Sequence, residues 1–288
     1  MESRRSVALP LLFSFHAKAS TPKFPAAKMI KLLSTDFDGT LVDHFAKPPV
    51  AQELFDSLAE LRSRGVLWAV NTGRELHHIV EGLTEFGFPI EPDFVLTAER
   101  EVFHRGKGGC WQDFGDWNAR CTAAHSELFA KAGPLLADIS AFLEAHVKAH
   151  PIYEGEHMVG LATDTDEAMD RVCEFLERER GRVPGFHFMR NTVYVRFCHE
   201  DYSKGTALGE LGRLTGIEPQ EIFAAGDHYN DLPMLDGRHA AYVACPSNSV
   251  EPVKHIVQQA GGYLAKGPCS IGIVEALRHF GALEPAAI

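Results

Sequence analysis

The sequence predicts a protein of the α/β class, in which helices cover a mainly parallel sheet and a smaller α+β module is inserted into it. Short apolar strands are expected over 30–35, 66–74 and 93–98, with helical segments between them. This alternation returns after residue 197, whereas the stretch 98–196 has pairs of strands between its helices. Short apolar strands that alternate with helices are typical of a parallel sheet buried on both faces.

The spacing of apolar residues places the other elements. Helices are expected over 50–65 and 75–87, because apolar residues recur there every three or four positions. The inserted module is predicted to have two strands around a glycine-rich turn, followed by helices and strands over 117–132, 134–149, 151–155, 158–163, 166–180, 186–190 and 192–197. The last part begins and ends with helices, and its predicted elements are 203–216, 221–227, 230–235, 241–245, 249–261 and 270–281. We therefore expect one domain formed by 29–97 and 197–288, and a second domain formed by 98–196.

Composition restricts the classes of function. The chain has 288 residues, of which 45% are hydrophobic and 23% charged, values ordinary for a globular protein. A formal net charge of −11 gives no basic surface for nucleic acid. No segment reaches the roughly 20 apolar residues of a membrane span. We therefore expect neither nucleic acid nor membrane as a partner, and the sequence leaves the oligomeric state open.

The cysteines and the first residues bear on the compartment. Six cysteines are scattered without a CxxC pair, which predicts free thiols in a reducing, cytoplasmic environment and no structural zinc site. Residues 1–28 hold one acid, several basic side chains and a short apolar run. Three interpretations of this segment stay open: a secretory signal, a transit peptide, or a stretch upstream of a true start at Met29.

Two carboxylates come directly after the first predicted strand. Asp36 and Asp38 are two residues apart, so in an extended stretch both side chains point toward one site. Gly39 permits a sharp exit from the strand, and Thr40 is placed to line or cap the segment after it. Such a pair can hold a hard cation, or one acid can attack an electrophile while the other moves protons.

Two further segments offer groups that bind anions. Thr72 stands at the end of the second predicted strand, and Gly73 exposes a backbone N–H that can bind a phosphate, with Arg74 beside it. Lys204, near the start of a predicted helix, is suited to placing a cation beside the acids.

A second group of acids comes after a later strand. Asp227 and Asp231 flank the turn after strand 221–227, and residues four apart share one face of a helical turn. Together with Asn230 they offer the oxygen ligands that suit Mg²⁺, which keeps several waters.

Taken together, DxDGT at 36–40, Thr72, Lys204 and GDxxND at 226–231 resemble, in that order, the four motifs of the haloacid dehalogenase superfamily. The resemblance extends from Ile30 to the C-terminus. It implies a Rossmann-like parallel-sheet core with an inserted cap domain, and a phosphatase activity that depends on Mg²⁺.

The resemblance also implies catalytic roles. Asp36 is expected to be the nucleophile that forms an aspartyl-phosphate, and Asp38 the general acid and base. Thr72 and Lys204 are expected to hold the phosphoryl oxygens. The other expected phosphate-binding or substrate-binding residues of the core motifs are Gly39, Thr40, Gly73, Arg74 and Asn230.

The same resemblance implies the metal ligands. Asp36, Asp227 and Asp231 are expected to hold Mg²⁺ together with the backbone carbonyl of Asp38. A phosphoryl group needs charge neutralisation above all, so a metal and a lysine are the expected equipment.

The position of the insertion narrows the subclass. The segment between Asp38 and Thr72 is too short for a domain, whereas the segment between Thr72 and Lys204 is long enough. This order resembles the type IIB, Cof-like branch with its α+β (C2B-type) cap, and 92–104 and 269–281 look like the sucrose-phosphate phosphatase group.

Substrate choice is expected to come from the cap closing over the site. The candidates by position are Glu99, Arg100 and Glu101 at the entrance to the cap, and His157 and Arg190 further along the chain.

Several functions remain open on the sequence alone. The leading hypothesis is a Mg²⁺-dependent phosphatase for a small phosphorylated metabolite, with a sugar phosphate as the first choice. The alternatives are a phosphatase specific for sucrose 6-phosphate, a phosphomutase, and a regulator that binds phosphorylated metabolites without turnover. The position of the cap disfavours the mutase, and the intact acids and Lys204 disfavour the regulator.

Overall fold

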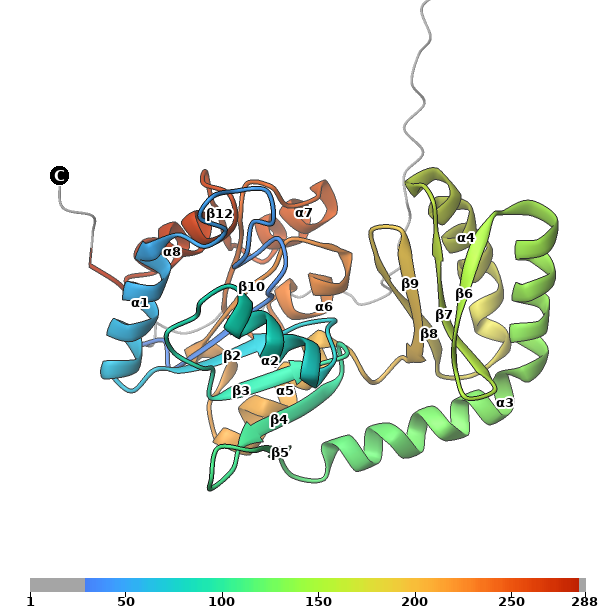
Figure 1. Ribbon diagram of the computed structural model, residues 1–288, viewed down its shortest axis with the longest axis horizontal. Coiled ribbons are helices and arrows are strands. Elements are labelled where there is room, and N and C mark those ends of the chain that lie inside the picture. Colours follow the sequence, from blue (N-terminus) through green and yellow to red (C-terminus); the bar gives the residue numbers. More distant parts are fainter. Residues whose placement is uncertain (1–28, 285–288) are drawn as a thin grey trace, which may run out of the picture.

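The structure, a computed structural model, describes residues 29–284, so the predictions for 1–28 lie outside it. Within these residues the chain forms two sheets that are joined by a long helix (Figure 1). The main sheet has eight strands in the order β12-β11-β10-β1-β2-β3-β4-β5, and the second sheet has four in the order β6-β7-β9-β8. The predicted α/β class is confirmed.

The main sheet is parallel except at one edge. Its strands are β1 (Leu32–Thr35), β2 (Leu67–Asn71), β3 (Phe94–Thr97), β4 (Glu101–Arg105), β5 (Trp111–Asp113), β10 (Ile222–Ala225), β11 (Tyr242–Cys245) and β12 (Tyr263–Leu264). β1 lies between β10 and β2 and pairs in parallel with both. β4 and β5 are antiparallel additions at the edge formed by β3. The carboxyl ends of the central strands therefore meet at one edge of the sheet.

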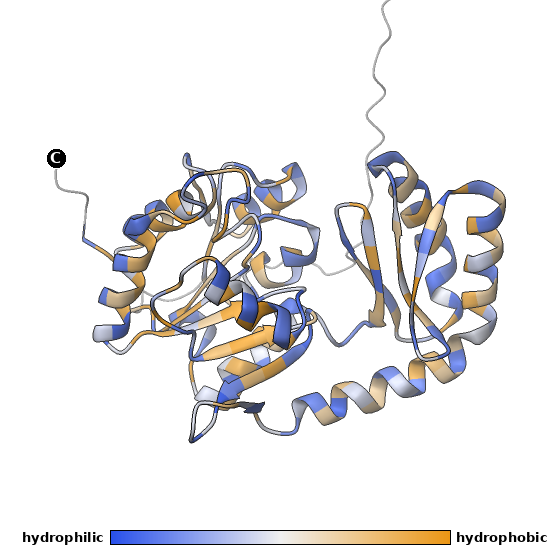
Figure 2. Cartoon of the chain, viewed as in Figure 1, coloured by the Kyte–Doolittle hydropathy of each residue, from blue (hydrophilic) through white to orange (hydrophobic). Residues whose placement is uncertain are grey.

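Helices cover both faces of the main sheet. On one face these are α1 (Gln52–Ser63), α2 (Leu76–Glu85) and α8 (Cys269–His279), and on the other α5 (Lys204–Thr215), α6 (Leu232–Leu235) and α7 (Glu251–Gln259). Neighbouring residues of a strand point to opposite faces. Accordingly Leu33 packs in the first of these two cores and Leu32 in the second. Figure 2 shows hydrophobic strands between helices that are polar on one side.

The second sheet is antiparallel and forms its own core. Its strands are β6 (Ala149–Glu154), β7 (His157–Thr163), β8 (Phe186–Asn191) and β9 (Tyr194–His199). The helices α3 (Trp117–His146) and α4 (Asp166–Glu179) pack on one face of it. Three short 3-10 turns complete the described elements: η1 (Arg180–Arg182), η2 (Pro219–Glu221) and η3 (Tyr229–Asp231).

The insert differs from the prediction at its start. The two strands expected around the glycine-rich turn exist as β4 and β5, but β4 pairs with β3 and β5 with β4, so they extend the main sheet. The reason is packing: Val102 lies in the core between the main sheet and α5–α7, and Phe103 packs on the opposite core. The second unit therefore begins within α3, whose first residue, Trp117, still contacts the main core.

A single helix replaces the two that were expected over 117–149. Pro134 lies inside α3 and removes one backbone donor, which ordinarily interrupts a helix. Here Ala132, Leu135 and Ile139 are all buried in the core of the second sheet, so packing on both sides of the proline keeps the helix continuous. The two-residue strand β12 was not predicted, because a strand of that length has no periodicity.

The described residues bear on two expectations from the sequence, the one about membrane spans and the one about free cysteines. None of the helices in 29–284 is both long and apolar enough to cross a bilayer. All six cysteines are free thiols, and five of them are buried.

Candidate active site

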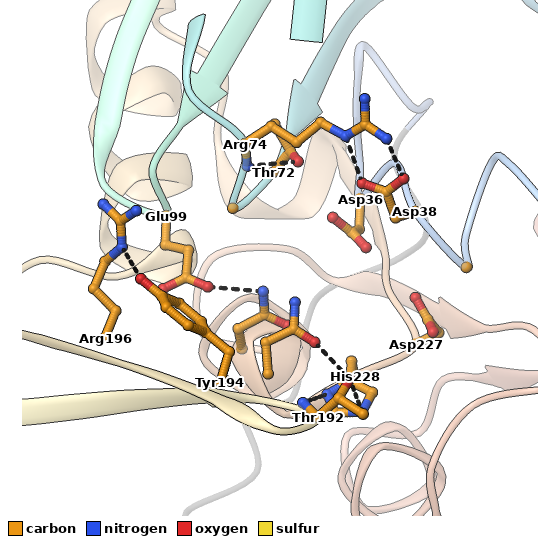
Figure 3. Close-up of a pocket in the computed structure, with 14 residues that line it drawn as sticks. Asp36, Asp38, Thr72, Arg74, Glu99, Thr192, Tyr194, Arg196, Asp227 and His228 are labelled. Carbon is orange, nitrogen blue, oxygen red and sulfur yellow. Dashed lines mark hydrogen bonds and ion pairs between the residues drawn. The ribbon is translucent and has the colours of Figure 1, made fainter. Parts of the chain in front are cut away.

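Three parallel strands bring polar residues to one edge of the main sheet. Asp36 directly follows β1, Thr72 directly follows β2, and Asp227 comes two residues after β10. Because these strands are neighbours and point the same way, the three side chains gather at the edge where parallel sheets bind ligands. Figure 3 shows them around one pocket. The predicted meeting of separate motifs is therefore observed in the fold.

Lys204 lies behind this edge and connects two of the acids. Its side chain is fully buried, with an exposed fraction of 0%. Its Nζ donates hydrogen bonds to Oδ1 of Asp36 and to Oδ1 of Asp231, both at 2.7 Å. Burial alone would lower the pKa of Lys204, but the charges of these carboxylates outweigh it and raise the pKa. Lys204 is therefore a permanent cation beside Asp36.

The acids form a compact, buried cluster. Oxygens of Asp36, Asp227 and Asp231 all lie within 4.8 Å of one another. Burial raises the pKa of Asp36 well above its usual value; Lys204 opposes this rise, and the other two acids add to it. Burial and the charge of Asp231 raise the pKa of Asp227 to about 7. A single lysine does not balance three carboxylates, so the cluster suits an additional cation with oxygen ligands.

Asp231 differs from the other two acids. Its Oδ1 accepts the hydrogen bond from Lys204, and its Oδ2 accepts backbone N–H groups of Asp227 and His228 at 2.8 and 2.9 Å. Asp36 and Asp227 line the pocket, whereas Asp231 does not. In this arrangement Asp231 orients the lysine and the turn, and the open carboxylates are those of Asp36 and Asp227.

The glycine of the first motif is required by a close approach. Gly39 has a φ of +77°, and a Cβ added to it would lie 2.4 Å from Oδ2 of Asp227. Thr40, the next residue, donates a hydrogen bond from Oγ1 to Oδ1 of Asp227 at 2.8 Å. Thr40 is buried and does not line the pocket. The loop 39–40 therefore holds Asp227 in place, and only glycine lets it pass so near.

Asp38 lines the pocket beside Asp36 and is held by Arg74 and His44 (Figure 3). Its Oδ2 accepts Nε of Arg74 at 2.7 Å, and its Oδ1 accepts a guanidinium N–H of Arg74 at 2.6 Å. Nε2 of His44 also lies 2.7 Å from Oδ1. Burial alone would raise the pKa of Asp38, but the hydrogen bonds and charge of Arg74, with His44, lower it. Arg74, predicted to bind phosphate, lines the pocket with its guanidinium on Asp38.

His44 was missed by the sequence reasoning. It stands in the loop after the first motif, six residues beyond Asp38, and no periodic pattern marks it. Its ring packs edge-on against Phe86 while it contacts the carboxylate. Only the folded path of this loop places it at the site.

The turns after β2 and β3 meet at the pocket. Oγ1 of Thr72 accepts the backbone N–H of Arg74 at 3.1 Å, which fixes the tight turn around Gly73. Glu99 follows β3, is buried, and accepts a hydrogen bond from Nδ2 of Asn230 at 2.9 Å. Burial raises the pKa of Glu99, while the charge of Lys204 opposes the rise. Thr72, Gly73, Glu99 and Asn230 all line the pocket.

The second sheet closes the other side of the pocket. Its contribution comes from β8, β9 and the turn between them, and the residues are Asn191, Thr192, Tyr194 and Arg196. Val195 and Phe197 point into the core of the second unit, so Tyr194 and Arg196 lie on the opposite face of β9. The sequence reasoning missed all four, although this alternation of polar and apolar residues was a usable signal. The pocket has a volume of about 490 Å³.

Two predicted substrate-binding residues lie elsewhere. Arg190 pairs with Asp166 and Asp170 on α4 of the second unit, and its guanidinium lies over the ring of Tyr229 in η3, on the main-sheet side. Arg100 does not line the pocket. The backbone at Ala98 and Glu99 has positive φ, which turns the chain so that only Glu99 enters the pocket.

His157 and Glu101 were also candidates, and the structure places both outside the pocket. His157 stacks on Phe129 within the second unit. Glu101 accepts a hydrogen bond from Oγ1 of Thr97 at 2.9 Å, at the pairing of β3 with β4. Both residues therefore make contacts within the fold, away from the pocket.

Known proteins resemble this chain over nearly its whole length. Residues 151–263 match the family of haloacid dehalogenase-like hydrolases. The chain is 26% identical to phosphoglycolate phosphatase from Methanoculleus marisnigri, over 88% of this chain and 97% of the relative. Two solved structures have the same fold. The sucrose-phosphatase from Synechocystis sp. PCC6803 has a TM-score of 0.63 and 22% sequence identity, and the match covers 88% of this chain and 99% of that one. The subclass IIB sugar phosphatase BT4131 has a TM-score of 0.61 and 18% sequence identity, and the match covers 88% of this chain and 100% of that one.

Proposed function

We propose that the chain belongs to the haloacid dehalogenase-like hydrolases, whose family model matches residues 151–263, and that it is a Mg²⁺-dependent phosphatase. Its substrate would be a small phosphorylated metabolite, a sugar phosphate in the first place, and its intermediate a phosphorylated Asp36. The observation that carries the proposal is the position of Lys204, whose Nζ joins Asp36 and Asp231 in a fully buried contact. A buried lysine that fixes a carboxylate at the floor of a pocket is the arrangement expected for an oriented nucleophile.

The donor set fits a magnesium ion. Asp36 and Asp227 offer open carboxylate oxygens within a crowded acid cluster, and hard oxygen ligands of this kind suit Mg²⁺. By the family resemblance the Asp38 carbonyl completes the protein ligands, and Asp231 supports them through Lys204 and the 227–231 turn. When bound, the ion would supply positive charge to the phosphoryl oxygens.

The first chemical step is transfer of the phosphoryl group to Asp36. A carboxylate oxygen of Asp36 forms a bond to phosphorus while the bond from phosphorus to the ester oxygen breaks. The leaving oxygen takes a proton from Asp38, so the alcohol departs neutral. Lys204 holds Asp36 in the orientation for attack, and the backbone N–H of Gly73 and the hydroxyl of Thr72 are placed to bind phosphoryl oxygens.

The second step is hydrolysis of the aspartyl-phosphate. Asp38, ionised after the first step, takes a proton from water as the water oxygen bonds to phosphorus. The bond between phosphorus and Asp36 breaks, and inorganic phosphate leaves. Arg74 and His44 favour the ionised form of Asp38, which is the form this step requires.

We assign the second unit the role of a cap that recognises the leaving group. Its hairpin β8–β9 lines the same pocket as the catalytic acids. The pocket of about 490 Å³ falls within the usual range of small-molecule sites, roughly 300–1,000 Å³. The fold shared with a sucrose-phosphatase and a sugar phosphatase supports a sugar phosphate as the first substrate to assay.

The test is release of phosphate from p-nitrophenyl phosphate and a panel of sugar phosphates, with and without Mg²⁺. We expect turnover that EDTA abolishes and that Asp36→Asn removes. Asp56→Asn, an exposed acid on α1, is the matched control and should keep wild-type turnover. Turnover that survives Asp36→Asn, or wild-type protein that hydrolyses no phosphate ester, would reject the proposal.

A further inference from the structure

Glu99 has a backbone conformation that its residue type disfavours. Its φ is +66°, and the preceding Ala98 has a φ of +48°. A side chain with a Cβ pays a steric cost in this region, so such residues are rare and concentrate at functional sites. Its backbone N–H donates to the carbonyl of Thr72 at 3.1 Å, which ties the turn to the phosphate-binding loop. The fold therefore imposes this conformation and aims Glu99 at the pocket.

The carboxylate of Glu99 is built into the pocket wall but is only half satisfied. Its Oε1 accepts the amide N–H of Asn230, and a Cβ on Gly73 would lie 3.3 Å from this oxygen. Its Oε2 has no hydrogen-bond partner among the described residues, although only 5% of Glu99 is exposed. Leaving a buried carboxylate oxygen unpaired is costly. The pocket therefore presents a strong acceptor that lacks a donor.

Donors stand on the opposite wall. Tyr194 and Arg196 come from β9 and line the same pocket as Glu99 (Figure 3). Nε of Arg196 donates to the hydroxyl oxygen of Tyr194 at 3.1 Å, so the Tyr194 O–H and the terminal guanidinium N–H groups of Arg196 can donate to a ligand. A group that both donates and accepts would satisfy the two walls at once. An alcohol hydroxyl is the simplest group with this property.

We propose that Glu99 is a specificity-determining residue that accepts a hydrogen bond from a hydroxyl of the leaving group, while Tyr194 or Arg196 donates to that hydroxyl oxygen. The substrate class is then the phosphate monoesters of polyols, sugars included, as opposed to esters of alcohols without further hydroxyls. This inference rests on the proposed phosphatase function. A site built around a buried acceptor rejects analogues that lack the matching hydroxyl, because the acceptor then stays unpaired.

A matched pair of substrates tests the proposal. Glycerol 1-phosphate and n-propyl phosphate have the same carbon chain and differ only in the two hydroxyls. We expect wild-type protein to prefer glycerol 1-phosphate in kcat/KM. In Glu99→Ala the ratio of the two kcat/KM values should fall about 10- to 100-fold, the loss expected for one hydrogen bond to a charged group. Glu99→Gln, which keeps the bond to Asn230 but turns an N–H toward the pocket, should give an intermediate ratio.

A second measurement separates recognition from structure. In wild-type protein, Glu99 has an unpaired carboxylate oxygen and a positive φ that a side chain disfavours. The variant Glu99→Gly should therefore have a melting temperature equal to or above that of the wild type. Glu101→Gln is the matched control, since Glu101 lies two residues away outside the pocket, and it should leave the ratio unchanged. Equal losses on both substrates in Glu99→Ala, a lower melting temperature in Glu99→Gly, or no wild-type preference would overturn the inference.

The outcomes distinguish this inference from the proposed function. Wild-type protein that hydrolyses neither ester nor p-nitrophenyl phosphate removes the phosphatase assignment, and the inference with it. Wild-type protein that hydrolyses p-nitrophenyl phosphate but shows the same ratio in all Glu99 variants removes only the role of Glu99.

Discussion

The main sheet and the second sheet form the two sides of one pocket in different ways. On the main-sheet side, buried groups from distant segments share short hydrogen bonds, such as those of Lys204 to Asp36 and of Thr40 to Asp227. On the other side, a single hairpin reaches the site, and Thr192 contacts His228 at 3.4 and 3.5 Å, at the limit of hydrogen bonding. The main-sheet side of the pocket is therefore joined internally by short, buried hydrogen bonds, whereas the turn of the hairpin meets it through long ones.

The largest expected effect comes from removing the buried contacts of Lys204 on the main-sheet side of the pocket. Lys204→Met should lower kcat by at least about 10³-fold, because it removes both the orientation of Asp36 and a positive charge near the phosphoryl group. It should also lower the free energy of unfolding by about 3–5 kcal/mol, since Asp36 and Asp231 are left buried without their cation. Steady-state kinetics and urea denaturation in EDTA measure the two losses.

Two variants accompany this experiment. Lys131→Met removes an exposed lysine on α3 and should change neither quantity measurably. Adding Asp231→Asn to Lys204→Met removes one uncompensated charge, so it should recover part of the stability and none of the activity. Wild-type kcat or wild-type stability in Lys204→Met would show that the buried contact does not organise the site.

Magnesium should change how stability depends on pH. Without metal, the pKa of Asp227 is about 7 in the folded state, against roughly 3.9 in an unfolded chain. The folded state then binds more protons between these values, so the free energy of unfolding should fall as pH rises from about 4 to 7. Mg²⁺ at 100 times its Kd should add about 2.7 kcal/mol above pH 7.

Urea denaturation at several pH values, in EDTA and in Mg²⁺, measures this coupling. Asp227→Asn should remove its own part of the pH-dependent loss, leaving the part due to Asp36, and should weaken the response to Mg²⁺, whereas the surface variant Asp56→Asn should keep both. A stability that rises with pH over this range in EDTA, or that ignores Mg²⁺ in wild-type protein, would contradict the metal site.

A smaller effect is expected from removing the contact between Arg74 and Asp38. Arg74→Gln frees Asp38 from its bidentate partner and should lower kcat about 10- to 100-fold, the range for a hydrogen bond to a charged group. Because Arg74 lowers the pKa of Asp38, its removal should move the acidic limb of the kcat profile to higher pH. Arg238→Gln, which loses only a surface pair with Asp236, is the control. An unshifted acidic limb would mean that Arg74 does not set the protonation of Asp38.

The same contrast explains what the sequence could predict. Asp36, Thr72 and Asp227 each come at the end of an apolar run, so local patterns and the geometry of parallel strands were sufficient to bring them together. His44 has no such marker, because its contact with Asp38 depends on the path of an irregular loop. The role of Arg74 was also hidden, since nothing in NTGR shows whether its guanidinium meets a phosphate or a carboxylate.

The second unit was harder to predict for a related reason. Its strands were placed well, but Arg190 was assigned to the substrate because the sequence does not show its partners on α4. Tyr194 and Arg196 were missed because a strand within a small α+β unit reveals its two faces, yet not which face meets another sheet. Pairing of whole units depends on contacts that no local pattern encodes.

The smallest effect is expected at the tip of the hairpin itself. Thr192 is β-branched and has a φ of +50°, so Thr192→Gly should relieve the backbone and raise the free energy of unfolding by about 0.4–1 kcal/mol. It also removes the weak contact of the hydroxyl with His228, so KM should change a few-fold while kcat is nearly kept. Thr165→Gly, which removes a helix cap on α4, should instead destabilise the protein. A large fall in kcat in Thr192→Gly would show that this turn takes part in catalysis, as the main-sheet side of the pocket is expected to do.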